Sequence, residues 1–297
     1  MKNYNILIFL SFIFSLNSIS SSYLPVALLH GFRQSCSEYD LISLEQYIGN
    51  KTGEYSKCIE TGGGTIDISR SFYDQAKKAC EIISQDEHYK NKNIAIVSIS
   101  QGGVLARYVI EKCKFPDNRR ISVFVSIGGP LSGTHQLPHC HRGVTCHILN
   151  SFTDWIVYKG YVQDTMGPAG YFRVSNHLDN FKESDSLLLD VNNQGKTFDE
   201  EAKNRFKSLD RLVLIAFKRD TMISPKESAH FGEYDKEHRV VNMKDTEVYK
   251  KDLFGLKSLE EENKIIYYWI DDNHCYYNLA DINMYIIPHL VDPTTSS

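Results

Sequence analysis

The chain has 297 residues, of which 42% are hydrophobic, and its formal net charge is −4. This length supplies enough apolar side chains for one sizeable α/β domain. The slightly acidic balance gives no basic surface of the kind that binds nucleic acid, so we expect no nucleic-acid partner.

The start of the chain has the composition of a secretory signal peptide. Lys2 supplies a positive charge, residues 6–16 are mostly apolar, and small serine residues precede the expected cleavage point. The apolar stretch is shorter than the roughly 20 residues that a membrane-spanning helix needs, and we expect no stable span elsewhere. We therefore predict a signal peptide over residues 1–22 and a single domain over residues 23–297. A retained signal anchor is the alternative.

Two predicted elements follow the leader. Residues 26–29 form an apolar run of strand length that ends at the sequence His-Gly-Phe. An amphipathic segment with Leu41, Leu44 and Ile48 comes next and leads to the sequon Asn50-Lys51-Thr52. We expect Asn50 to lie in a polar, glycine-containing loop and to carry an N-linked glycan.

Residues 93–99 form a second apolar strand, followed by Ser100, a glutamine and two glycines. A strand, a sharp turn and a helix in this order typically place a serine hydroxyl above the end of a sheet. Gly102 and Gly103 satisfy the need for small neighbours in such a turn. The usual pattern is G-x-S-x-G, whereas this chain has Ser98 at the first glycine position. The sequence predicts that Ser100 is a nucleophile; an ordinary strand leading into a glycine-rich helix start is the alternative.

A serine nucleophile of this kind requires an acid and a histidine, each just past the end of a later strand. Residues 211–217 are an apolar run that leads to Asp220, and residues 264–270 are β-branched and aromatic and precede His274. We predict that Asp220 and His274 complete a triad with Ser100. The two aspartates just before His274 are alternatives for orienting the histidine.

Attack on an acyl carbonyl also needs backbone N–H donors for the developing oxyanion. One is expected from the residue after the nucleophile, Gln101. The other comes from the loop after an earlier strand, and the N–H of Phe32 is the natural candidate.

Residues 121–127 form a further strand-like run, and helical segments separate most of the strands, which favours a mainly parallel sheet. The interval 131–209 interrupts this rhythm, and a connection of this length typically carries a lid or a binding insertion. We expect some of its bulky apolar residues to pack the insertion on the sheet and others to line a groove for an acyl chain. They are Phe152, Trp155, Ile156, Val162, Met166, Tyr171 and Phe172.

Several separated blocks resemble lysosomal palmitoyl-protein thioesterases. The blocks are HGF-x-x-SC near the mature start, SQGG at Ser100, SIGGP-x-SG-x-x-x-LP-x-C over residues 126–140, and Asp220 followed by S-P and later F-G. The resemblance extends from about residue 24 to residue 290. It implies an α/β-hydrolase fold with a mainly parallel central sheet flanked by helices, and a cap or acyl-binding region over residues 131–209. It also implies that Ser100, His274 and Asp220 are catalytic.

The activity implied by the resemblance is hydrolysis of the thioester between a long-chain acyl group and cysteine in S-acylated proteins or peptides. It proceeds through an acyl-enzyme, uses no cofactor, and has Phe32 and Gln101 in the oxyanion hole. A lipase or carboxylesterase, or an acyl-CoA thioesterase of the same fold, would share the triad, because a thiolate leaving group with a pKa near ~8.5 requires no different residues. A non-catalytic lipid-binding module is a further alternative. The leader, the sequon and the resemblance favour a lysosome-like compartment or secretion.

The seven cysteines fit an oxidising compartment. The resemblance implies the disulfides Cys80–Cys113 and Cys140–Cys146. Cys36, Cys58 and Cys275 remain, and one arrangement is a bridge between the first two with Cys275 free. Residues 135–147 are dense in His and Cys, but their spacing fits no standard zinc pattern, so we expect no metal site.

Overall fold

The computed structural model describes residues 22–63, 70–135 and 156–295. Its centre is a six-stranded sheet with the strand order β2-β1-β3-β4-β5-β8, in which all neighbouring strands are parallel. The strands are β1 (Val26–Leu29), β2 (Ser56–Ile59), β3 (Asn93–Ile99), β4 (Arg120–Ile127), β5 (Arg211–Phe217) and β8 (Ile265–Ile270). The chain places β2 on one side of β1 and β3 on the other. In parallel sheets, a reversal of this kind typically places a ligand site at the carboxyl ends of the two strands, here β1 and β3.

All five strands expected from the sequence are present, and their ends agree with the expectation to within one residue. The sequence did not suggest β2, which lies at the edge of the sheet. Ser56 and Lys57 in this short strand are only partly buried, so it lacks the continuous apolar run of the central strands.

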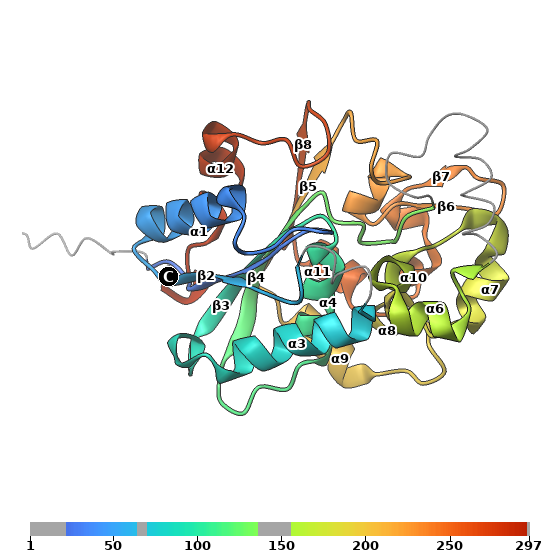
Figure 1. Ribbon diagram of the computed structural model, residues 1–297, viewed down its shortest axis with the longest axis horizontal. Coiled ribbons are helices and arrows are strands. Elements are labelled where there is room, and N and C mark those ends of the chain that lie inside the picture. The colour runs from blue at the N-terminus through green and yellow to red at the C-terminus, as the bar shows by residue number, and fades with distance from the viewer. Residues whose placement is uncertain (1–21, 64–69, 136–155, 296–297) are drawn as a thin grey trace, which may run out of the picture.

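Helices cover both faces of the sheet (Figure 1). On one face, α1 (Tyr39–Thr52) and α12 (Leu279–Tyr285) pack against Val26 and Leu28 of β1. On the other face, α3 (Phe72–Gln85) and α4 (Gly102–Lys112) pack against Ala27 and Leu29. Successive β1 side chains therefore enter opposite layers, as the pleat of a strand requires.

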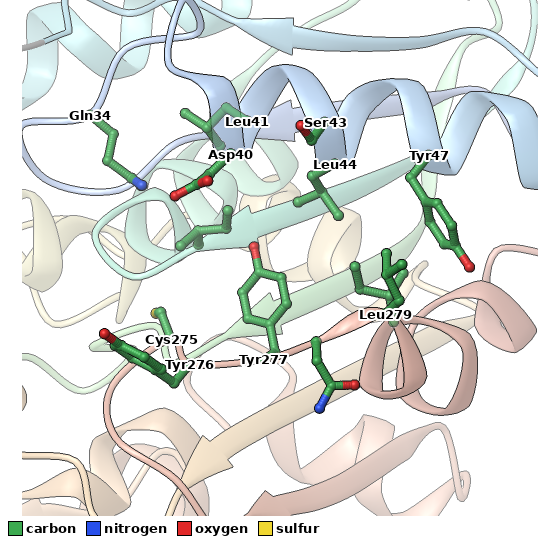
Figure 2. Close-up of a pocket in the computed structure, with 13 residues that line it drawn as sticks. Gln34, Asp40, Leu41, Ser43, Leu44, Tyr47, Cys275, Tyr276, Tyr277 and Leu279 are labelled. Atoms are coloured by element: carbon green, nitrogen blue, oxygen red, sulfur yellow. The ribbon is translucent and has the colours of Figure 1, made fainter.

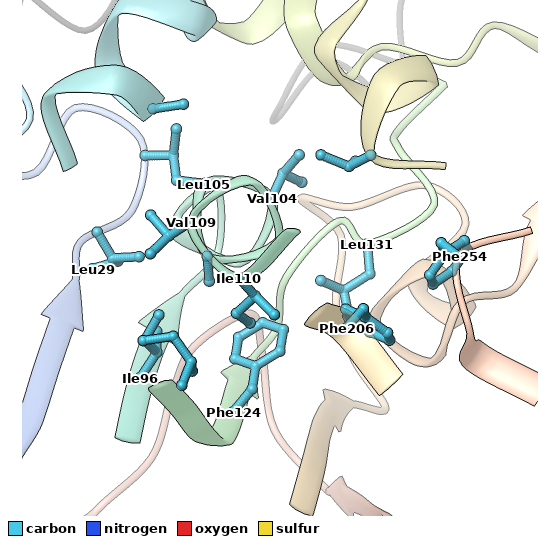
Figure 3. Packing of buried hydrophobic residues seen from close by; sticks show 14 of the residues in the cluster. Leu29, Ile96, Val104, Leu105, Val109, Ile110, Phe124, Leu131, Phe206 and Phe254 are labelled. Carbon is cyan, nitrogen blue, oxygen red and sulfur yellow. The ribbon is translucent and has the colours of Figure 1, made fainter. Parts of the chain in front are cut away.

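The layer on the α4 side is the larger of the two buried clusters (Figure 3). Val104, Leu105 and Val109 of α4 lie among Leu29 and Phe124 of the sheet. Phe206 of α9 (Glu200–Lys207) and Phe254, which precedes α11 (Leu256–Glu261), extend it.

The described part of the interval 131–209 contains short helices rather than strands. They are α6 (Gly160–Thr165), η2 (Gly167–Tyr171), η3 (Ser175–His177), α7 (Leu178–Glu183), α8 (Leu187–Val191) and α9. Later in the chain lie η4 (Lys226–His230), the two-stranded β6 (Glu233–Tyr234) and β7 (Val240–Val241), and α10 (Glu247–Lys250).

Arg107 connects α4 to this insertion. Its guanidinium is fully buried and donates to Glu111 at 3.0 Å, to the Leu131 carbonyl at 3.1 Å and to Asn192 Oδ1 at 2.7 Å. It also donates to the Val191 carbonyl at 2.5 Å. One side chain thus ties the helix that follows Ser100 to the first residue of the insertion and to residues 191–192.

Two disulfides are present in the described part of the chain, Cys36–Cys58 and Cys80–Cys113. The first joins the loop after β1 to β2, and the second joins α3 to the end of α4. Cys275 is free. The expected partners Cys140 and Cys146 lie outside the described residues.

The position of Asn50 differs from the sequence expectation. It lies in the last turn of α1 and not in a loop, because the helix continues past the buried Ile48 and ends only at Gly53, which has a φ of 72°. The Asn50 side chain is exposed, so the sequon still faces solvent. Among the residues that the structure describes, no helix is both long and apolar enough to span a bilayer.

Candidate active site

Ser100 lies in the tight turn between β3 and α4, with a φ of 50°. This left-handed conformation is uncommon for a residue with a side chain and is typical of a nucleophile elbow. The backbone of β1 crosses close by, since a Cβ on Gly102 would lie 2.5 Å from the Leu29 carbonyl oxygen. Ser98 fits at the first glycine position because its buried hydroxyl donates to the Val125 carbonyl at 3.4 Å.

His274 and Asp220 form a continuous hydrogen-bond chain with Ser100. His274 Nε2 is 2.9 Å from Ser100 Oγ, and His274 Nδ1 is 2.6 Å from Asp220 Oδ2. The other carboxylate oxygen of Asp220 accepts the backbone N–H groups of Met222 at 2.7 Å and Ile223 at 3.0 Å. The aspartate is therefore fixed by its own loop, and it directs one oxygen at the imidazole.

The surroundings of His274 favour its charged form. Burial by itself lowers the pKa of this imidazole, but interaction with Cys275 and the hydrogen bond to Asp220 outweigh burial and raise the pKa. An imidazole in this setting stabilises the positive charge that it gains when it accepts a proton from a serine.

The alternative acids do not contact the histidine in this way. Asp271 and Asp272 lie 3.7 and 3.3 Å from the Arg219 guanidinium, and their side chains are 74% and 41% exposed. The Asp220 side chain is 1% exposed. Of the three aspartates, Asp220 is the one with the position that a triad requires.

The two expected oxyanion donors flank Ser100. Gln101 is buried at the start of α4, and Phe32 lies in the loop after β1, where it lines a pocket together with Ser100. A Cβ on Gly31 would lie 3.3 Å from Ser100 Cβ, so this loop passes very close to the elbow. Both backbone segments thus lie beside Ser100.

A carboxylate that the sequence did not single out holds the Phe32 loop in place. Glu60 accepts the backbone N–H of Cys36 at 2.9 Å, the hydroxyl of Ser35 at 3.0 Å and the backbone N–H of Gly62 at 3.0 Å. Burial raises the pKa of Glu60, but the hydrogen bonds from Gly63, Cys36 and Gly62 outweigh burial and lower the pKa to about 2. The Cys36–Cys58 disulfide reinforces the same connection. The acceptor role of Glu60 depends on packing between two loops and has no signal in the local sequence.

A pocket of about 230 Å³ opens beside Ser100 and His274. Tyr171 and Phe172 enter it from the insertion, and Met222 and Ile223 enter it from the loop that carries Asp220. The Tyr171 hydroxyl donates to Gln101 Oε1 at 3.1 Å. The wall that these four residues form is mostly apolar. It lies on the side of Ser100 that faces the insertion.

The other apolar residues expected to line a groove have different surroundings. Val162 is buried in a small cluster that includes Phe172, and Ile156 packs on the same cluster. Met166 is 38% exposed. Phe152 and Trp155 lie outside the described residues. Met222 and Ile223 were not predicted to line the pocket, because they belong to a loop without an apolar pattern.

Of the His and Cys residues between 135 and 147, only His135 is described. Its Nδ1 accepts the backbone N–H of Ser175 at 3.1 Å, and burial together with the neighbouring His238 and His177 lowers its pKa to about 4. His139, Cys140, His141, Cys146 and His147 lie outside the described residues.

A different group, His30, Cys36 and Glu60, has its ligand-type atoms within 4.8 Å of one another. The Cys36 sulfur is in a disulfide, so it offers no thiolate to a metal ion.

Comparisons with known proteins agree over most of the chain. A family model described as palmitoyl protein thioesterase matches residues 25–274. Palmitoyl-protein thioesterase 1 of Caenorhabditis elegans is 30% identical over 84% of this chain and 86% of that protein. Lysosomal thioesterase PPT2-B of Xenopus laevis is 28% identical over 90% of this chain and 91% of that protein. A solved putative hydrolase from Agrobacterium vitis S4 covers 91% of this chain and 88% of its own, with 13% identity and a TM-score of 0.47.

Proposed function

Because the chain belongs to the palmitoyl protein thioesterase family, we propose that Ser100, His274 and Asp220 carry out its thioester hydrolysis. The observation that carries this proposal is the hydrogen-bond chain from Asp220 through His274 to Ser100, with lengths of 2.6 and 2.9 Å. The conformation of Ser100 at the end of β3 supports it as well.

In the acylation step, Ser100 Oγ attacks the thioester carbonyl carbon while His274 Nε2 takes the hydroxyl proton. Asp220 keeps the imidazole in the tautomer that accepts this proton and offsets the charge that forms. The backbone N–H groups of Phe32 and Gln101 stabilise the oxyanion. When the tetrahedral intermediate collapses, the C–S bond breaks and the cysteine sulfur leaves with the proton held by His274. The acyl group remains as an ester on Ser100.

In the deacylation step, a water molecule attacks the ester carbonyl, and His274 takes one of its protons. The second tetrahedral intermediate uses the same oxyanion donors. The C–O bond to Ser100 then breaks, His274 returns the proton to Ser100 Oγ, and the fatty acid is released.

The acyl chain occupies the pocket formed by Tyr171, Phe172, Met222 and Ile223. Burial of an alkyl chain contributes roughly 0.8 kcal/mol per methylene, so an apolar wall beside the nucleophile favours long acyl groups. The pocket residues and the family support S-acylated proteins and peptides as substrates. The insertion over residues 131–209 then forms the cap of a single hydrolase domain that spans residues 23–297.

The test compares Ser100→Ala with Ser98→Gly, which restores the usual first glycine of the elbow. Ser100→Ala is expected to abolish turnover of an S-palmitoyl cysteine peptide and labelling by a fluorophosphonate, while its melting temperature changes little. Ser98→Gly is expected to retain both reactions. Near-wild-type turnover by Ser100→Ala would refute the role of this serine.

A substrate panel tests the thioester assignment. Acyl-cysteine peptides, acyl-CoA and acyl oxygen esters with the same graded chain lengths are compared by kcat/KM. We expect the highest values for long-chain acyl-cysteine peptides. A clear preference for oxygen esters would favour a lipase or carboxylesterase instead.

We also propose that the protein passes through the secretory route to a lysosome-like compartment. The leader-like residues 1–22, the exposed Asn50 and the relatives named lysosomal thioesterases support this address. Glycosidase treatment is expected to lower the apparent mass of the wild type but not that of Asn50→Gln. A cytosolic, unglycosylated protein that keeps Met1 would contradict it.

A further inference from the structure

A second groove, of about 720 Å³, lies next to the pocket at Ser100. It runs between α1 and the segment that leads from His274 into α12, and Tyr276, Tyr277 and Leu279 form one of its sides (Figure 2). Gln34, Ile99 and Cys275 line both spaces. A molecule bound at Ser100 can therefore extend from the pocket into this groove.

We propose that the groove binds the peptide part of an acylated substrate and that Asp40 selects peptides with a lysine or arginine beside the acylated cysteine. This inference rests on the function proposed above. It adds that the enzyme prefers leaving groups in which a positively charged residue lies beside the cysteine.

The first support is the division of space around Ser100. A thioester has an alkyl substituent on one side and a peptide on the other, and the apolar wall of Tyr171 and Phe172 suits the alkyl side. The second groove has a different character, because Ser43, Asn278 and the tyrosine hydroxyls can hydrogen-bond to peptide groups. It is also the larger of the two spaces.

The second support is charge. Among the described residues that line this groove, Asp40 is the only one with a formal charge at neutral pH. Its side chain is exposed in the first turn of α1 and points toward the groove (Figure 2). Burial raises the pKa of Tyr277, and the nearby Asp40 carboxylate also raises it.

The third support comes from the aromatic rings. Tyr47, Tyr276 and Tyr277 line the groove, and the faces of such rings attract cations. The Tyr47 ring already interacts with the Lys51 ammonium, 5.6 Å from its centre, which leaves Tyr276 and Tyr277 for a peptide cation. A cationic peptide side chain thus finds one carboxylate and two aromatic rings.

The experiment measures kcat/KM for three S-acyl cysteine peptides that differ only in the flanking residue, which is lysine, alanine or glutamate. Wild type is expected to prefer the lysine peptide over the glutamate peptide by about 2- to 5-fold, the range of an exposed ion pair. Asp40→Asn is expected to remove most of this preference, and Asp40→Lys to invert it. The preference is also expected to shrink as salt is added.

Asp74→Asn is the matched control. Asp74 and Asp40 both lie in the first turn of a 14-residue helix and are both exposed, but Asp74 does not line the groove. Both variants lose a carboxylate at a helix N-terminus, so they lose a similar helix-dipole contribution. Asp74→Asn is expected to keep the wild-type preference.

A neutral S-acyl N-acetylcysteamine distinguishes a failure of the proposed hydrolysis from a failure of the proposed role of Asp40. It lacks a peptide, so wild type and all Asp40 variants are expected to hydrolyse it at equal rates. Failure to hydrolyse any thioester would overturn the proposed function. Normal hydrolysis with equal kcat/KM for the lysine and glutamate peptides would overturn the role of Asp40 alone.

Discussion

The hydroxyl of Tyr171 donates a hydrogen bond to Gln101 Oε1 at 3.1 Å, and this bond joins the insertion to the residue that follows Ser100. Gln101 Nε2 donates in turn to Gln75 Oε1 at 3.3 Å. The side chain of Gln101 is therefore fixed from two sides. This arrangement keeps its backbone N–H, the proposed oxyanion donor, in one position.

Tyr171→Phe removes the first of these hydrogen bonds and keeps the ring in the pocket wall. We expect kcat to fall by about 2- to 10-fold, the effect of one hydrogen bond, while KM changes little. Steady-state kinetics with an S-acyl peptide provide the measurement. Tyr268→Phe is the control, because the Tyr268 hydroxyl contacts His289 at 2.9 Å and does not contact Gln101. An equal loss of kcat in both variants would contradict this explanation.

Asp220→Asn is expected to reduce kcat by up to about 10⁴-fold, because an amide favours the wrong tautomer of the partner histidine. The amide oxygen can still accept the N–H groups of Met222 and Ile223, so the loop is expected to keep its conformation. Asp272→Asn is the comparison, since Asp272 pairs with Arg219 at the surface. If kcat fell only a few fold in Asp220→Asn but strongly in Asp272→Asn, Asp272 and not Asp220 would be the acid that orients His274.

Cys275→Ala is expected to change the pH dependence of the reaction. Cys275 is one of the groups that raise the pKa of His274, so its removal lowers that pKa. His274 accepts a proton only when it is neutral, and a lower pKa keeps it neutral at lower pH. The acid limb of the kcat/KM profile should therefore move to lower pH, and the plateau should persist. A shift to higher pH would contradict the assigned effect of Cys275.

Glu60→Gln tests whether the carboxylate between the Phe32 loop and the β2 end positions the oxyanion site. The amide replaces one acceptor oxygen with a donor, so it cannot accept all the hydrogen bonds from Ser35, Cys36 and Gly62. We expect kcat to fall by about 10-fold and a boronic acid inhibitor to lose more affinity than the substrate. Glu87→Gln, at an exposed carboxylate that pairs with Lys90, is expected to have no effect. Equal weakening of inhibitor and substrate would indicate a purely structural role.

The low pKa of Glu60 also sets the pH range in which this loop is held. The folded state depresses the pKa from 4.5 to about 2, so the stabilisation is complete above the unfolded value and is lost as the pH falls toward 2. We expect the wild type and Glu60→Gln to differ most in melting temperature above pH 5. The difference should narrow below pH 3.

The sheet was predictable because β3, β4 and β5 are buried on both faces and read as continuous apolar runs. The edge strand β2 has no such run, and the end of α1 was placed too early because Gly49 and Asn50 resemble a loop in sequence. Local composition does not show that the buried Ile48 stabilises one more turn of the helix.

The candidate triad was accessible to sequence reasoning for a geometric reason. Ser100, Asp220 and His274 each follow a strand of one parallel sheet, and the carboxyl ends of those strands meet at one edge. Glu60 and the Tyr171–Gln101 hydrogen bond depend instead on how loops pack on one another. No spacing rule in the sequence reports such contacts.

The buried guanidinium of Arg107 has a consequence for how the reaction rate depends on aggregation of the substrate. Its contacts with Leu131, Val191 and Asn192 tie the described part of the insertion to the helix that begins at Ser100. Swinging the insertion aside would break three hydrogen bonds from this buried guanidinium, each worth about 1.5 to 3 kcal/mol because the donor is charged. Interfacial activation, in which a cap opens at a lipid surface and the rate jumps, would require such a movement. The rate should instead rise smoothly with substrate concentration through the point at which acylated peptides form micelles.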